Sequence, residues 1–137
     1  MLEFIKRLFV KQPQPNVSVT DRDYALMNAV HFVFPDAKKH LCQRHIEQCV
    51  FQRALQQPGF MKQAAEGFKF KWNWAIHAPT IGEWHRRWER VQESYPSWPG
   101  LLNYCIHTWI STHSEMILSA YTDYYFHFRS YTTNRFI

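Results

Sequence analysis

Two short strand-like segments alternate with helical patterns in the first third of this chain, and this order limits its possible folds. Val17 and Val19 alternate with polar residues, which is typical of a strand, and a second strand is predicted over 37–41. A helical pattern precedes the first strand and follows each of the two. The order helix, strand, helix, strand, helix predicts an α/β layer with about two parallel strands.

The three helices of this region have predicted ends. The first covers 2–11, where apolar residues fall on one helical face. Thr20 and Asp23 resemble a capping box that opens the second helix, with Asp23 as an acid in its first turn. Pro35 ends this second helix, and the third runs over about 42–57.

From about 60 to 129 the chain carries only helical patterns. Trp84, Trp88, Val91 and Tyr95, for example, recur at helical spacing. The chain is rich in aromatic residues, with 6 Trp, 7 Tyr and 11 Phe. We interpret the aromatic stripes as the core of a helical region, because such side chains bury large areas. A platform for stacking nucleic-acid bases is the alternative.

The charge and the cysteine content limit which partners and which cellular compartment are expected for this chain. The 137 residues carry a formal net charge of +5, which fits a nucleic-acid partner. The chain has three cysteines, an odd number without close pairing: Cys42, Cys49 and Cys105. No disulfide framework is therefore predicted, and an intracellular protein is expected. No apolar run approaches the ~18 residues of a membrane span, so no membrane partner is expected.

Several sequence blocks resemble one family of transposases. Residues 19–30 read V-T-D-R-D-Y-A-L-M-N-A-V, residues 34–37 read F-P-D-A, and residues 41–46 read L-C-Q-R-H-I. They are similar to a T-D-R-x-x-A-L-x-N-A block, an F-P-x-A turn and a C-x-x-H helix start in Mutator-like element (MULE) transposases. The T-T-N-R segment at 132–135 continues this resemblance, which covers essentially the whole chain.

The resemblance implies a fold, a chemistry and a division of the chain. The fold is a partial ribonuclease-H-like core over 1–57, a predominantly helical insertion over 58–129, and an approach to the last catalytic position over 130–137. The chemistry is DDE-type cleavage and strand transfer of DNA at transposon ends, with Mg²⁺ held by three carboxylates. Asp21 is implied to be the second of these carboxylates. The resemblance also implies a nuclear protein.

The other two acidic positions of the family lack a counterpart in this sequence. The first Asp of the family falls upstream of residue 1, and the position of the last Glu is occupied by Ile137, which cannot bind Mg²⁺. We therefore expect a truncated chain that is catalytically incomplete and binds no Mg²⁺ stably. We also expect one unpaired sheet edge, through which the chain could self-associate.

Two further interpretations stay open. Cys42 and His45, the residues of the C-x-x-H motif, can share a helix face with Cys49, which gives three ligands for a zinc-stabilised helical domain. The chain could also be a non-enzymatic DNA-binding module or a domesticated interaction module. Salt-dependent DNA binding and metal analysis distinguish these interpretations.

Overall fold

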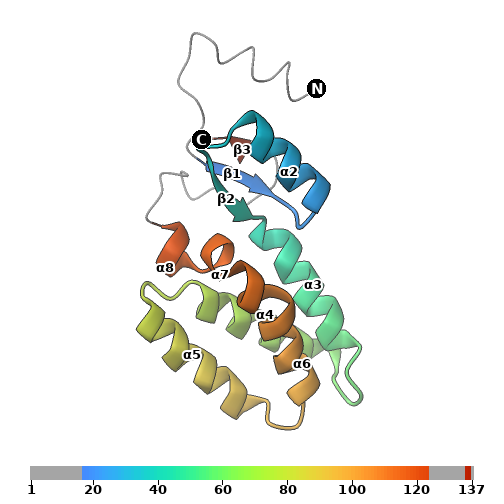
Figure 1. The fold of residues 1–137 in the computed structure, drawn as a ribbon. Coiled ribbons are helices and arrows are strands. Elements are labelled where there is room, and N and C mark those ends of the chain that lie inside the picture. The colour runs from blue at the N-terminus through green and yellow to red at the C-terminus, as the bar shows by residue number, and fades with distance from the viewer. Residues whose placement is uncertain (1–16, 124–134, 137) are drawn as a thin grey trace. The chain divides into compact units, whose positions relative to one another are not determined.

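The computed structural model describes residues 17–123 and 135–136, which form parts of two compact units (Figure 1). The first, the sheet unit, consists of residues up to Cys42 and from Asp123 onward. The second, the helical unit, consists of Gln43–Thr122. The helix predicted over 2–11 lies outside the described residues. The boundaries predicted after residues 57 and 129, between the core, the helical insertion and the last segment, rest on the family pattern and stay predictions.

The sheet unit contains a sheet with the strand order β2-β1-β3. Strands β1 (Val17–Thr20) and β2 (Lys38–Leu41) are parallel, as predicted, with Val17 opposite Lys38 and Thr20 opposite Leu41. Strand β3 (Arg135–Phe136) pairs with the other edge of β1 in the antiparallel direction. This pairing covers Ser18 and Val19 of the β1 edge, where two strands alone would leave β1 unpaired. The described residues do not support the predicted self-association.

Helix α2 (Tyr24–Val33) begins at a cap that differs from the predicted one. Its N-cap is Asp23, whose Oδ1 accepts a hydrogen bond from the backbone N–H of Leu26 at 3.2 Å. Thr20 is a buried residue of β1, so it does not cap the helix and Asp23 is not a first-turn acid. The pairing of Thr20 with Leu41 explains the difference, because it keeps Thr20 in the strand.

Loss of this cap is expected to destabilise the sheet unit. The Asp23→Ala variant leaves a helix-terminal N–H without its acceptor, which typically costs about 0.5–2 kcal/mol in the free energy of unfolding. Hydrogen exchange at the amides of α2 measures the change. Asn28→Ala, at an exposed position inside the same helix, is the control and should cost nothing measurable. Equal exchange in both variants would contradict the cap assignment.

Helices make up the helical unit, as the sequence predicts for the region after residue 58. Helix α3 (Gln43–Leu55) begins one residue later than predicted, because Cys42 extends the β1–β2 pairing through its backbone N–H. The remaining helical segments are α4 (Lys62–Ile76), α5 (Ile81–Ser94), α6 (Pro99–Tyr104), the π-helical segment η1 (Cys105–Ile110), α7 (Ser111–Ile117) and α8 (Ser119–Thr122). No described helix is both long enough and apolar enough to cross a membrane.

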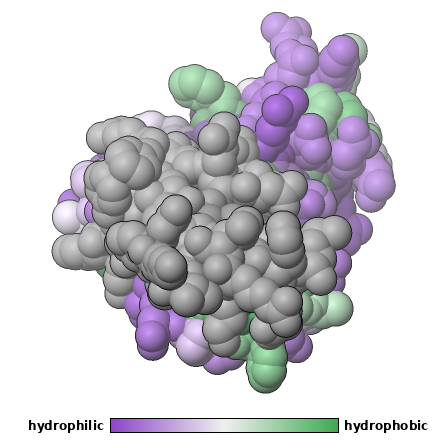
Figure 2. Space-filling model, turned by 90° about the horizontal axis from the view of Figure 1, so that it is seen from above, coloured by the Kyte–Doolittle hydropathy of each residue, from purple (hydrophilic) through white to green (hydrophobic). Residues whose placement is uncertain are grey.

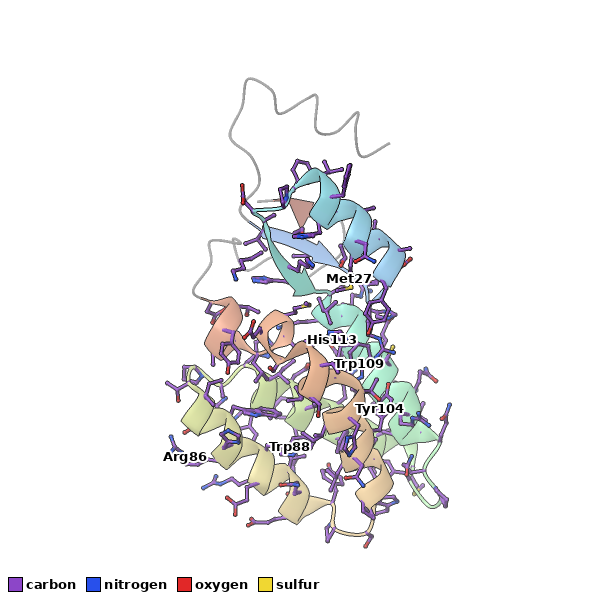
Figure 3. The ribbon with its side chains drawn as sticks, in the orientation of Figure 1. Met27, Arg86, Trp88, Tyr104, Trp109 and His113 are labelled. Carbon is purple, nitrogen blue, oxygen red and sulfur yellow. The ribbon has the colours of Figure 1, made fainter. Side chains whose placement is uncertain are left out.

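Aromatic side chains form much of the core of the helical unit (Figure 3). Trp72 and Phe68 of α4 are fully buried. The Trp88 ring lies edge-on to Trp72 at 6.1 Å and stacks on Trp84 at 5.5 Å, centroid to centroid. The predicted core role of the α5 stripe is thus confirmed for Trp84, Trp88 and Val91, which are buried. The described surface visible in Figure 2 is mainly hydrophilic, with small hydrophobic patches.

Candidate functional site

Asp21 and Cys42 lie at the carboxyl ends of two neighbouring parallel strands. Thr20 ends β1 and Leu41 ends β2, and these two residues are register partners, so Asp21 and Cys42 follow at the same edge of the sheet. The backbone N–H of Cys42 donates a hydrogen bond to the Thr20 carbonyl at 2.7 Å, which joins the two strand ends. Ligands of α/β sheets commonly bind outside the carboxyl ends of the strands.

Asp21 is only partly buried, although its neighbours at this edge are buried. Thr20 and Cys42 are 6% and 4% exposed. The Asp21 carbonyl accepts a hydrogen bond from the backbone N–H of Asp23 at 2.8 Å, in the tight turn that leads into α2. This turn fixes the backbone of Asp21 at the sheet edge. Carboxylate oxygens are hard ligands of the kind that Mg²⁺ prefers.

The third strand adds a segment from the far end of the sequence to this sheet. Arg135 pairs with Val19 and Phe136 with Ser18, so β3 runs away from the Asp21 end of β1 as the chain proceeds. Residues 130–134 and Ile137 lie outside the described residues. The prediction that Ile137 occupies the position of the last Glu of the family therefore stays a prediction.

His45 and Cys49 occupy successive turns of α3 in the helical unit. Their Nε2 and Sγ atoms lie 3.7 Å apart, and the His45 ring meets the edge of Trp109 at 6.4 Å between centroids. Cys42 precedes the helix, so the predicted helix face shared by Cys42, His45 and Cys49 is wrong for Cys42. Within residues 17–123 and 135–136, no three His, Cys, Asp or Glu side chains are grouped to hold a metal ion. The interpretation as a zinc-stabilised helical domain stays a prediction, and metal analysis of the protein tests it.

A hollow of about 450 Å³ lies along α3, between this helix and Tyr104 of α6. We call its lining the α3 surface; it consists of His45, Gln48, Cys49, Gln52, Arg53, Gln56 and Tyr104. The guanidinium carbon of Arg53 lies 4.4 Å from the centre of the Tyr104 ring. The Trp109 indole N–H donates to the Tyr104 hydroxyl at 3.3 Å, and partial burial raises the pKa of Tyr104. The structure thus adds a polar surface that the sequence analysis did not identify.

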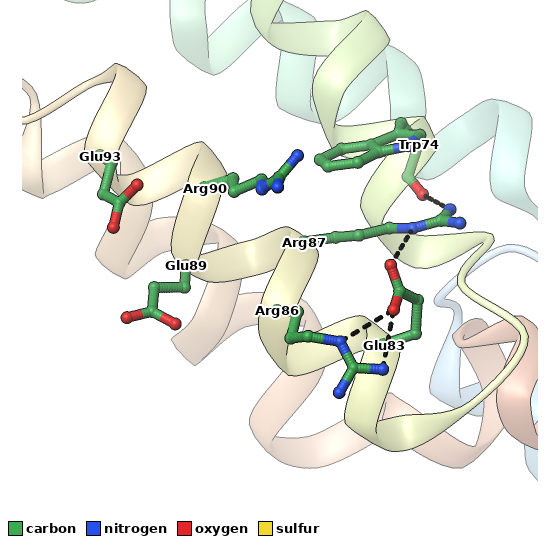
Figure 4. Close-up of a pocket in the computed structure, with 7 residues that line it drawn as sticks. All are labelled: Trp74, Glu83, Arg86, Arg87, Glu89, Arg90 and Glu93. Atoms are coloured by element: carbon green, nitrogen blue, oxygen red, sulfur yellow. Dashed lines mark hydrogen bonds and ion pairs between the residues drawn. The ribbon is translucent and has the colours of Figure 1, made fainter.

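A second hollow, of about 440 Å³, lies between α4 and α5 (Figure 4). Glu83 binds both Arg86, at 2.8 Å, and Arg87, at 3.2 Å, and these hydrogen bonds lower the pKa of its carboxyl group. Arg87 also donates to the Trp74 carbonyl at 2.8 Å. Three arginines and three glutamates line the hollow, so its charges balance; they are Arg86, Arg87, Arg90, Glu83, Glu89 and Glu93.

The three cysteines are free thiols in different surroundings. Cys42 and Cys105 are buried, whereas Cys49 is partly exposed on the α3 surface. Burial raises the pKa of the Cys105 thiol far above its ordinary value, because a thiolate is poorly solvated in the core. Cys105 is therefore a packing residue and not a nucleophile.

Comparison with known proteins connects the sheet edge to one family. The family model of the MULE transposase domain matches residues 2–49, a segment that contains Asp21, Cys42, His45 and Cys49. No curated protein and no solved structure matches the chain. The match supports the family that the sequence blocks predicted over residues 2–49, which are similar to a segment of the MULE transposase domain. The predicted resemblance of residues 50–137 lies outside the match and stays a prediction.

Proposed function

We propose that this chain acts in DNA cleavage and strand transfer as part of a DDE-type MULE transposase. The observation that carries the proposal is the position of Asp21, at the carboxyl end of β1 and inside the segment that matches the family. A carboxylate at a partly exposed sheet edge, beside the end of a parallel strand, fits a metal ligand in a ribonuclease-H-like fold.

In this proposal Asp21 is the second acidic ligand of a Mg²⁺ centre. Bound Mg²⁺ would stabilise the attacking and leaving oxygens of an in-line phosphoryl transfer. Asp21 supplies hard oxygen ligands, and Thr20 and Cys42 hold its backbone in place through the joined strand ends. Asp21 is one of three carboxylates in this proposal, and the family pattern assigns no other residue of this chain to the centre, so we expect no strand transfer by this chain alone.

DNA binding is the property of the isolated chain that tests the proposal. We expect a fluorescently labelled duplex to bind at 50 mM salt and to dissociate progressively as the salt is raised to 200 mM. The reason is counterion release, which lowers the logarithm of affinity by about 0.9 per phosphate contact for each tenfold rise in salt. Fluorescence anisotropy measures this slope.

Two results would contradict the proposal. Absence of duplex binding at 50 mM salt contradicts the assignment of DNA as the substrate. Strand transfer by the 137-residue chain with Mg²⁺ alone contradicts the statement that further carboxylates are needed. The same reaction without Mg²⁺ is the control for metal dependence.

A further inference from the structure

The α3 surface contains a row of three glutamines with unused hydrogen-bonding groups. Gln48, Gln52 and Gln56 recur every four residues, and the last of them follows the end of α3 directly. All three are exposed, and their amides make no hydrogen bond to another described residue. At 1.5 Å per helical residue, the row is roughly 12 Å long. It therefore offers a line of paired donors and acceptors on one side of a surface helix.

The charge of the α3 surface is suited to a polyanion. No Asp or Glu is among the described residues that line the hollow, whereas Arg53 is. Glu47 also belongs to α3, but its carboxylate pairs with Lys69 of α4 at 3.5 Å and does not line the hollow. The hollow between α4 and α5 differs, because its three arginines are balanced by three glutamates.

Tyr104 restricts where the Arg53 side chain can lie. The guanidinium is held over the Tyr104 ring at 4.4 Å, and the hydroxyl of the same tyrosine is held by the Trp109 indole. A guanidinium packed over an aromatic ring has less freedom to move, and its N–H groups can still donate to another ligand. Arg53 can thus meet a phosphate beside the glutamine row.

Glutamine amides match the edges of bases in duplex DNA. A Gln side chain can bind the N6 and N7 atoms of adenine together, in the major groove, which is wide enough to admit a helix. With base pairs stacked about 3.4 Å apart, a row of roughly 12 Å spans three to four base pairs. The glutamines therefore have the spacing to contact successive base pairs, while Arg53 contacts the backbone.

We propose that the α3 surface docks in the major groove of duplex DNA, with Gln48, Gln52 and Gln56 on base edges and Arg53 on a phosphate. This inference rests on the proposed function in one respect, since both take duplex DNA as the ligand. It assigns base reading to a helix whose first half, up to residue 49, lies inside the segment matched to the family and whose second half lies beyond it.

The test separates base reading from general binding to DNA. The 137-residue chain is used to select from a randomised 20-base-pair duplex pool, and its affinity for one mixed-sequence duplex is measured by anisotropy. We expect wild-type protein to enrich a short, adenine-containing sequence. The triple variant Gln48→Ala, Gln52→Ala and Gln56→Ala should lower this enrichment at least about 10-fold and change the affinity for the mixed duplex by less than about threefold.

Matched variants control for composition, folding and charge. Gln63→Ala with Gln92→Ala removes two exposed glutamines elsewhere in the helical unit and should leave the enrichment unchanged. Alanine favours helix, so the triple variant should keep its circular dichroism spectrum. Arg53→Gln should reduce the slope of log affinity against log salt by about 1, whereas Arg90→Gln on α5 should leave it unchanged.

Three results would overturn the inference. Wild-type enrichment that survives in the triple variant shows that the glutamines do not read bases. Binding to the mixed duplex without any enrichment by wild-type protein contradicts base reading and leaves the proposed function standing. Absence of any DNA binding by wild-type protein contradicts both proposals.

Discussion

The Trp72→Ala variant is expected to lose about 3–5 kcal/mol in the free energy of unfolding of the helical unit. Trp72 of α4 is fully buried, and its ring packs edge-on to Trp88 of α5 at 6.1 Å. The loss combines the hydrophobic transfer of a large side chain with the cavity that remains. Because whole domains are stable by only about 5–15 kcal/mol, a change of this size brings the unit close to unfolding at room temperature.

Packing is the source of this contribution, because the indole N–H of Trp72 has no hydrogen-bond partner among the described residues. Trp72→Phe should therefore cost less than Trp72→Ala, as it keeps an aromatic ring and removes the unpaired donor. Urea unfolding followed by circular dichroism at 222 nm measures both variants. Phe70→Ala is the matched control, since Phe70 is 74% exposed in the same helix. Similar losses for Trp72→Ala and Phe70→Ala would contradict the assigned core.

The elements with local sequence signals were predicted, and the element without one was missed. Strands β1 and β2 and the helices could be predicted because periodicity, prolines and polar caps are local features. Strand β3 could not, since Arg135 and Phe136 are too few to show alternation and pair with Val19 and Ser18 from the other end of the chain. The start of α3 was misplaced by one residue because Cys42 continues the strand pairing, which depends on a distant backbone carbonyl.

The candidate site was predicted only in part, for a similar reason. Two parallel strands were enough to predict that Asp21 and the C-x-x-H motif follow strand ends, and the structure places Asp21 and Cys42 at one edge. The α3 surface could not be predicted in the same way. Its glutamine spacing is visible in the sequence, but the hollow exists only because α6 places Tyr104 opposite α3.

In a MULE transposase that carries residues 2–49 of this chain, replacement of Asp21 by Asn is expected to lower DNA strand transfer by about 1,000-fold or more. Asparagine keeps the size of the side chain but removes the negative charge that would hold Mg²⁺ in the proposed site. A ligated metal ion contributes several kcal/mol of transition-state stabilisation, and each 1.36 kcal/mol is a factor of ten in rate. Asp23→Asn is the matched control, two residues away, because asparagine caps helices as well as aspartate does.

The most direct measurement of the central claim is strand transfer by a chimaeric MULE transposase that carries residues 2–49 of this chain in place of its own segment. The rate is measured with Mg²⁺ for the chimaera and for its Asp21→Asn and Asp23→Asn variants. We predict that Asp21→Asn lowers the rate of strand transfer by about 1,000-fold or more. The rate with Asp23→Asn should stay within about threefold of the unmodified chimaera. A chimaera with Asp21→Asn that transfers strands at the unmodified rate would contradict the role of Asp21 as a metal ligand.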